Sequence, residues 1–246
     1  GEDTAFGALN IYSTNVNVFD DSEVNILREF SEDLAFGINV IRGQRLHDET
    51  QSKLSKTLLE TIGAIAMTVE KRDPYTAGHQ TRVAKLSVEI ARSLGWDKDR
   101  VEGLRLGATI HDIGKIYIPA EILNRPGKLS EHEFGMIKTH AEVGHEIIAG
   151  VDFPWPVKEM ILQHHERLDG TGYPHGLKGD EIVEEAKIIG VADVVEAITS
   201  HRPYRPALGI DVGLQEIERG RGTAYDPEIV DACIKVIKED GFQWDE

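Results

Sequence analysis

The sequence predicts an all-α helical bundle, preceded by a short strand and long linker helices. Apolar residues recur at helical spacing in one segment after another, which is typical of amphipathic helices. No stretch after residue 15 has the alternating pattern of a strand. Residues that typically begin helices divide this region into segments. These start signals are Asp73-Pro74, Ser130 with Glu133, Asp180, and Asp226-Pro227.

The N-terminal residues begin with a segment of a different kind. Residues 5–13 alternate loosely and are predicted to form one strand, and helical spacing follows from Val24 to Ile38. A single strand has no ladder partner, so the pair resembles the last strand and last helix of a GAF-type sensor domain. We therefore expect residues 1–48 to be the end of such a domain with a connecting helix, and residues 49–246 to be a second domain.

A second apolar face runs from Leu54 to Val69, which extends the helical pattern into a rod from about residue 21 to 72. A narrow apolar stripe is typical of helices that pair with a copy of themselves, and this interpretation predicts a homodimer through the N-terminal helices. The alternative is a helix that packs on its own domain. The pattern alone does not choose between the two.

The charge and cysteine content limit the classes of partner. The chain has 27 basic and 43 acidic side chains and a formal charge of −16, which argues against nucleic acid or an anionic membrane as a partner. The sequence contains no run of about 18 apolar residues, so we predict no membrane segment in this chain. Cys233 is the single cysteine, so we expect no disulfide, no thiolate metal site and a cytoplasmic location.

Five apolar segments each contain histidine or aspartate side chains of the kind that bind metals. One buried histidine is usually a hydrogen-bonded core residue, but seven unpaired polar groups in one core would each cost about 2 kcal/mol or more. A shared metal centre compensates all of them, and helical bundles build such centres from inward-facing side chains. The predicted ligands are His79, His111, Asp112, His140, His164, His165 and Asp193.

Seven ligands are too many for one tetrahedral zinc and suit two divalent ions. The absence of thiolate favours iron, manganese, zinc or nickel, and Asp112 is the natural bridge between the ions. Two ions about 3.5–4 Å apart suit hydrolysis at phosphorus. Lys115, one helical turn after Asp112, is predicted to stabilise charge on a phosphoryl oxygen or to protonate the leaving group. The alternative for Lys115 is a surface lysine at a helix end.

Two motifs that occur in order give these residues a family likeness. His111-Asp112 with Gly114-Lys115, followed by "HHERLDGTGYP" with Gly172-Tyr173-Pro174, resembles the HD-GYP domain over about residues 55–243. This is a subgroup of the HD metal-dependent phosphohydrolases. The resemblance implies hydrolysis of the bacterial second messenger cyclic di-GMP to pGpG, with a second cut to GMP in some members. It also implies the same seven ligands, with iron or manganese as the expected metal.

The resemblance further suggests residues that contact substrate. Arg202 and Arg205 match positions that contact substrate phosphate in relatives, and guanidinium groups suit phosphate oxygens; the alternative is a solvated loop. Arg82, one turn after His79, is either another phosphate contact or a support for a ligand. Tyr75 stands where some relatives carry a glutamate that helps to hold a third metal, so we expect two metals, with Tyr75 hydrogen-bonding a ligand or the substrate.

The glycine-rich loop around Gly172-Tyr173-Pro174 has three interpretations. It is a cradle for phosphate, a rigid turn that orients His164 and His165, or, as the resemblance implies, a contact surface for a partner protein. The sequence does not choose among them.

Two other functions compete with the phosphodiesterase. One is an HD-type phosphohydrolase that acts on a mononucleotide or a nucleotide alarmone, against which the Gly-Tyr-Pro motif weighs. The other is a catalytically silent receptor for a cyclic dinucleotide. Degenerate members of the family normally lose ligands, and here all seven ligand positions are filled. The sequence therefore favours an active enzyme.

Overall fold

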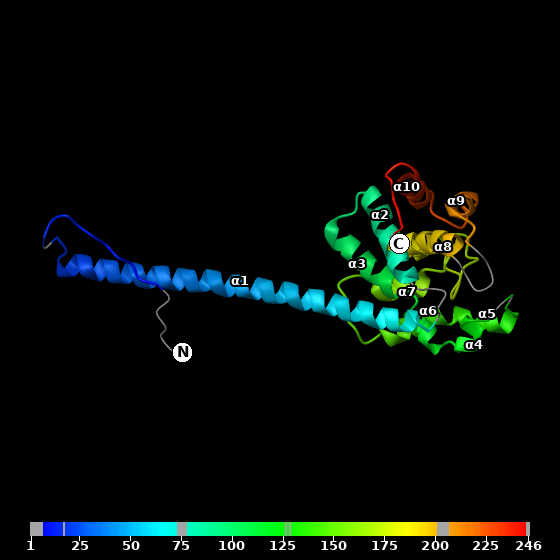
Figure 1. Cartoon of the computed structure of the whole chain (residues 1–246), viewed down its shortest axis with the longest axis horizontal. Coiled ribbons are helices and arrows are strands. Elements are labelled where there is room, and N and C mark those ends of the chain that lie inside the picture. The colour runs from blue at the N-terminus through cyan, green and yellow to red at the C-terminus, as the bar shows by residue number, and fades with distance from the viewer. Residues whose placement is uncertain are drawn as a thin grey trace. The chain divides into compact units, whose positions relative to one another are not determined.

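The computed structural model describes residues 7–16, 18–72, 78–125, 127, 129–200 and 207–244. These residues form helices and short 3₁₀ turns without a strand, which confirms the all-α prediction. No helix among them is both long and apolar enough to cross a membrane. The elements (Figure 1) are α1 (Asp21–Glu70), α2 (His79–Ser93), α3 (Lys98–Ile110), η1 (Ile113–Tyr117), α4 (Ala120–Leu123), α5 (Glu131–Lys138), α6 (His140–Ile147), α7 (Val157–Gln163), η2 (Gly179–Glu181), α8 (Glu184–Thr199), α9 (Ile210–Arg219) and α10 (Pro227–Lys238).

The predicted N-terminal strand is wrong for the part that the structure describes, since residues 7–13 are irregular and residues 5 and 6 lie outside the described ranges. A lone strand has no neighbouring strand to complete its hydrogen bonds, so local alternation is not enough to form one. The rod is present as one uninterrupted helix, α1. Asp20 and Glu23 begin it with reciprocal side-chain to backbone hydrogen bonds of 2.8 and 2.9 Å.

The C-terminal end of α1 packs on the helical domain, as the alternative interpretation of its apolar face proposed. Ala66 and Val69 are buried, and Leu59 and Ile62 are partly buried, in a core that also contains residues of α3 and α7. Contacts divide the chain into Gly1–Leu58 and Leu59–Glu246. The predicted boundary between residues 48 and 49 falls inside α1, and the origin of the first part in a sensor domain stays a prediction.

The helix start signals differ in how well they locate helices. Ser130 and Glu133 form the predicted capping box of α5, and Asp226 caps α10 with proline at the first turn. Asp180 lies instead in the 3₁₀ turn η2, and α8 begins at Glu184. A contact with α7 holds the residue before α8 in place, because the side chain of Gln163 accepts a 2.8 Å hydrogen bond from the Val183 amide. The Asp73-Pro74 signal lies outside the described residues.

A second and larger core lies among α2, α3, α8, α9 and α10. Its fully buried side chains include Leu86 and Ile90 of α2, Leu104 of α3 and Ile189 of α8. The helix α8 also approaches the end of α7 very closely, since a Cβ atom on Gly190 would lie 2.6 Å from the carbonyl oxygen of His164. This approach brings α8 beside the adjacent histidines that follow α7.

Candidate metal centre

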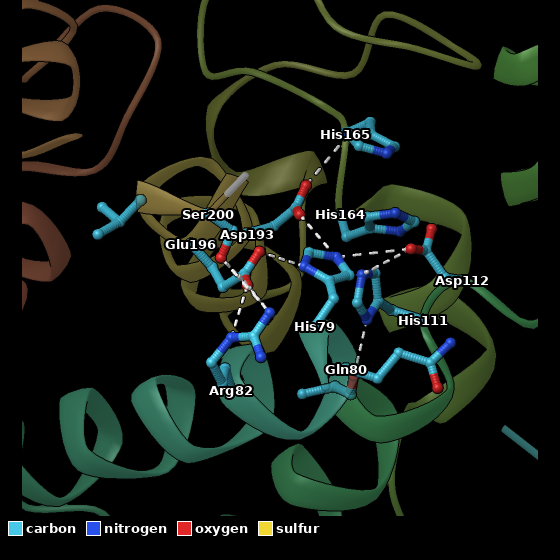
Figure 2. Close-up of polar contacts among 12 residues, drawn as sticks. His79, Gln80, Arg82, His111, Asp112, His164, His165, Asp193, Glu196 and Ser200 are labelled. Atoms are coloured by element: carbon cyan, nitrogen blue, oxygen red, sulfur yellow. Dashed lines mark hydrogen bonds and ion pairs between the residues drawn. The ribbon is translucent and has the colours of Figure 1, made fainter. Parts of the chain in front are cut away.

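The structure brings all seven predicted ligands together, although they come from segments spread over more than a hundred residues. They form two groups, and within each group one ligand atom per residue lies within 4.8 Å of the others. Figure 2 shows six of the seven side chains converging from different helical segments. The first group is His79, His111 and Asp193, and the second is Asp112, His140, His164 and His165.

Asp112 lies between the two groups, and its two carboxylate oxygens face different ones. Its Oδ2 atom is 3.6 Å from Nε2 of His79 and 3.5 Å from Nε2 of His111. Its Oδ1 atom is 3.4 Å from Nε2 of His140. One carboxylate thus faces donors of both groups, which is the arrangement that a bridging ligand requires.

The hydrogen bonds of three histidines prepare them for metal binding. Nδ1 of His111, His140 and His164 lies 2.7, 2.6 and 2.7 Å from the backbone carbonyl oxygen three residues earlier. A carbonyl oxygen only accepts, so each Nδ1 carries the proton and each Nε2 presents a lone pair. Neutral imidazole in this tautomer is a common ligand for divalent metals.

None of these three lone pairs has a protein donor to satisfy it among the described residues. Nε2 of His111 is buried and has no hydrogen-bond partner among the described residues. Nε2 of His140 lies only 3.3 Å from Nε2 of His164, so two acceptors face each other. Buried acceptors left in this way are unfavourable. A bound cation satisfies both arrangements, and the donor set therefore fits two divalent ions.

His79 is held by a residue that the sequence analysis missed. Its Nδ1 atom hydrogen-bonds to the carboxylate of Glu196, which is completely buried. Arg82 donates to the same carboxylate through Nε at 2.8 Å and Nη2 at 2.6 Å. These contacts support the interpretation of Arg82 as a support for a ligand. The signal for Glu196 was its position one helical turn after Asp193 in an apolar helix.

Lys115 lies at the centre, and its contact differs from that of a surface lysine. Its ammonium is 2.5 Å from Oδ2 of Asp112, and only 20% of its side chain is exposed. The amine is therefore placed beside the carboxylate that lies between the two ligand groups.

The close packing of η1 on α6 brings Asp112 next to His140. A Cβ atom on Gly114 would lie 1.9 Å from the carbonyl oxygen of His140 and 2.5 Å from the amide nitrogen of Gly144. No side chain fits at this contact. Gly114 therefore permits the approach that joins the two ligand groups.

The Gly-Tyr-Pro loop is anchored against the ligands. The ring of Tyr173 stacks on His165 with 4.6 Å between ring centroids, and its amide donates to the carbonyl oxygen of His165 at 3.3 Å. Glu166, a buried residue that the sequence analysis also missed, accepts hydrogen bonds of 2.7–3.1 Å from the amides of residues 175–177. These contacts favour the interpretation of the loop as a rigid turn that orients the histidines.

Three predicted substrate contacts lie outside the described residues. They are Tyr75, Arg202 and Arg205.

The pKa values of the metal-free centre follow from burial and from the neighbouring charges. Burial lowers the pKa of His140, and burial together with neighbouring imidazoles holds the pKa of His164 and His165 well below 6.5. Burial alone would also lower the pKa of His79, but hydrogen bonds to Asp193 and Glu196 raise it to about 9. His79 must therefore release a proton when a metal binds at neutral pH.

These shifts predict that the metal-free protein is most stable near pH 6.5, the usual pKa of histidine. Above it, stability falls as pH rises toward about 9, because folded His79 holds a proton that the unfolded chain releases earlier. Below it, stability falls because the unfolded chain protonates His164 and His165 while the folded chain does not. The melting temperature of chelator-treated protein, measured between about pH 5 and 9, tests this.

Added Mn²⁺ should remove the loss of stability on the alkaline side, because deprotonation of His79 favours metal binding. A metal-free melting temperature that rises steadily across the same pH range would contradict the prediction.

Comparison with known proteins places the chain among relatives. The sequence model of one family, described as an HD domain, matches residues 63–229. The cyclic di-GMP phosphodiesterase response regulator RpfG of Xanthomonas campestris pv. campestris is 39% identical over 178 residues, which cover 72% of this chain and 47% of that protein. The 3'3'-cGAMP-specific phosphodiesterase 3 of Vibrio cholerae is 42% identical over 177 residues, which cover 72% and 38%.

Among solved structures, Bd1817, an HDG"Y"P protein from Bdellovibrio bacteriovorus, superimposes with a TM-score of 0.55 at 23% identity, covering 65% of this chain and 51% of that chain. This likeness concerns the fold alone. The chain spans less than half the length of the two curated relatives.

Proposed function

The chain belongs to the HD domain family, and from this premise we propose that it is a metal-dependent phosphodiesterase that hydrolyses cyclic di-GMP to pGpG, with GMP as the product of any second cut. The observation that carries the proposal is the position of Asp112 between two groups of metal-binding side chains. A centre with two ions and a shared carboxylate suits in-line displacement at phosphorus. The relatives named as cyclic-dinucleotide phosphodiesterases supply the class of substrate.

We assign the seven side chains of the two groups as ligands of two divalent ions, with iron or manganese as the expected metals. When bound, the two ions would lower the pKa of water and polarise the phosphodiester. Asp112 places one oxygen toward each group. The Nδ1 hydrogen bonds of His111, His140 and His164 hold these imidazoles in the tautomer that a ligand needs.

Lys115 is proposed to act on the reacting phosphate. Its ammonium contacts Asp112 and is partly open to solvent, so it is within reach of a phosphoryl oxygen held at the centre. A positive charge there stabilises the negative charge that develops on phosphoryl oxygens, and the same group can protonate the leaving 3′ oxygen.

Replacing Lys115 with methionine is expected to lower kcat by about 100-fold or more, because one donor to developing charge is lost. The metal content should stay the same, since lysine is not a ligand. Steady-state kinetics and metal analysis on one preparation test this. Lys158→Met is the matched control, because the Lys158 ammonium bonds to the carbonyl oxygen of Ala149 and to none of the proposed ligands. An unchanged kcat for Lys115→Met would contradict the assignment.

A second candidate substrate is 3'3'-cGAMP, because one relative that is 42% identical is named as specific for it. The deciding experiment compares kcat/KM for cyclic di-GMP and 3'3'-cGAMP and identifies the products by chromatography. Preference for cyclic di-GMP with pGpG as the first product supports the proposal. Preference for 3'3'-cGAMP would make that nucleotide the substrate and leave the proposed reaction unchanged. If the protein hydrolyses neither nucleotide, both are ruled out as substrates.

The proposal includes finer assignments. We propose that the substrate contacts are Arg202, Arg205 and Tyr75. Arg82 is proposed to support the ligand His79 through its contact with Glu196. A homodimer is proposed through the exposed apolar residues of the N-terminal part of α1, such as Phe30 and Phe36. A protein partner is proposed at Gly172-Tyr173-Pro174, and the single cysteine supports a cytoplasmic location.

A further inference from the structure

Glu196 is a buried carboxylate that the proposed chemistry does not use as a ligand. Its side chain is completely buried, and it lies on α8 three residues after the proposed ligand Asp193. Burying a carboxylate is unfavourable by several kcal/mol unless its charge is paired and its oxygens accept hydrogen bonds. The contacts of Glu196 therefore show which groups its buried charge pairs with and holds in place.

The two carboxylate oxygens of Glu196 face different partners. Oε2 is hydrogen-bonded to Nδ1 of His79. Oε1 accepts from Arg82 through Nε at 2.8 Å and Nη2 at 2.6 Å, and from the Ser200 hydroxyl at 2.6 Å. Figure 2 shows the carboxylate between the guanidinium and the imidazole. Arg82 thus pairs the charge of a group whose other oxygen holds His79.

His79 differs from three of the other histidines in the source of its Nδ1 partner. His111, His140 and His164 use a carbonyl oxygen three residues earlier in the chain. His79 is the first residue of α2 and uses a side chain of α8, 117 residues away. Its Nε2 atom then faces Asp193 at 3.2 Å and Asp112 at 3.6 Å. The direction in which Nε2 points depends on a contact between two helices.

We propose that Glu196 is a positioning residue that fixes the tautomer and ring orientation of His79 for metal binding, and that Arg82 holds Glu196 in place. This inference deepens the proposed function and rests on it. A carboxylate behind a ligating histidine raises the basicity of the ligand and orients its ring. The effect is expected at the group of His79, His111 and Asp193, because the imidazole that Glu196 contacts belongs to that group.

The test is a calorimetric titration of the metal-free protein with Mn²⁺, which measures the affinity of each ion. Glu196→Gln is expected to weaken the binding of one of two ions by about 10- to 100-fold and to leave the other unchanged. A neutral amide directs either its oxygen or its NH₂ group toward His79, so it cannot satisfy both His79 and Arg82. Glu185→Gln is the matched control, because Glu185 is also buried on α8 and pairs with Arg100 away from the ligands.

Glu196→Asp gives a second measurement in case the glutamine variant does not fold, as circular dichroism would show. It keeps the charge but withdraws the carboxylate by one methylene, so the same ion should bind more weakly than in the wild type. Equal binding of both ions in the wild type and in the folded variants would overturn the inference alone. A wild type that binds no Mn²⁺ would overturn the metal centre itself.

Discussion

Replacing Asp112 with asparagine is expected to lower turnover of cyclic di-GMP by at least about 1000-fold, which corresponds to about 4 kcal/mol of lost transition-state stabilisation. The carboxylate of Asp112 faces His79 and His111 with one oxygen and His140 with the other. Asparagine is neutral and offers one carbonyl oxygen, so it cannot link the two ligand groups. The metal content should fall from about two ions per chain to one or none.

Kinetics and metal analysis on the same sample measure both effects, and circular dichroism checks that the helices remain. Asp231→Asn is the control, because Asp231 is an exposed residue of α10 that pairs with Arg221. Full turnover by a correctly folded Asp112→Asn protein would show that the proposed ligand assignment is wrong.

Gly114→Ala is expected to reduce the free energy of unfolding by about 3 kcal/mol or more, at the upper end of what overpacking usually costs. The new methyl group would lie 1.9 Å from the carbonyl oxygen of His140 and 2.5 Å from the amide of Gly144. These are backbone atoms, which cannot rotate away as a flexible side chain does. For a domain of this size the melting temperature should fall by roughly 6–12 °C.

Gly135→Ala is the matched control for this prediction. Gly135 lies in α5 and a Cβ atom there meets nothing within 4 Å, so alanine should be neutral or slightly stabilising. Thermal unfolding of the two variants in parallel separates the local contact from the general effect of replacing glycine. A Gly114→Ala protein as stable as Gly135→Ala would contradict the close packing of η1 on α6.

The convergence of the ligands was predictable because each one lies in an apolar segment, although in the structure only Asp193 lies inside a helix and the other six lie at the first residue of a helix or just after its end. A histidine or aspartate at a buried position needs compensation, and this physical constraint is visible in the sequence before any fold is known. The position of Lys115 beside Asp112 followed from a spacing of three residues in a helical segment. Local patterns therefore identified the groups that form the candidate centre.

The supporting residues were not predictable in the same way. Glu196 acts on His79 across 117 residues, and the loop that Glu166 anchors is irregular. Glutamate is usually solvent-exposed, so the place of Glu196 one turn after Asp193 is a weak signal, and only the packing of α2 on α8 shows that it is buried. The wrong strand at residues 7–13 has a related cause, since alternation predicts a strand only where a neighbour can complete the ladder.

The most direct test of the account measures metal content and hydrolysis of cyclic di-GMP on one anaerobically purified sample of the chain. The account predicts about two metal ions per chain and turnover to pGpG or GMP that is lost when the metal is removed. Bound metal and tight binding of the nucleotide without turnover of any cyclic dinucleotide would contradict the enzyme and indicate a receptor. Turnover that survives complete removal of metal would contradict the metal centre.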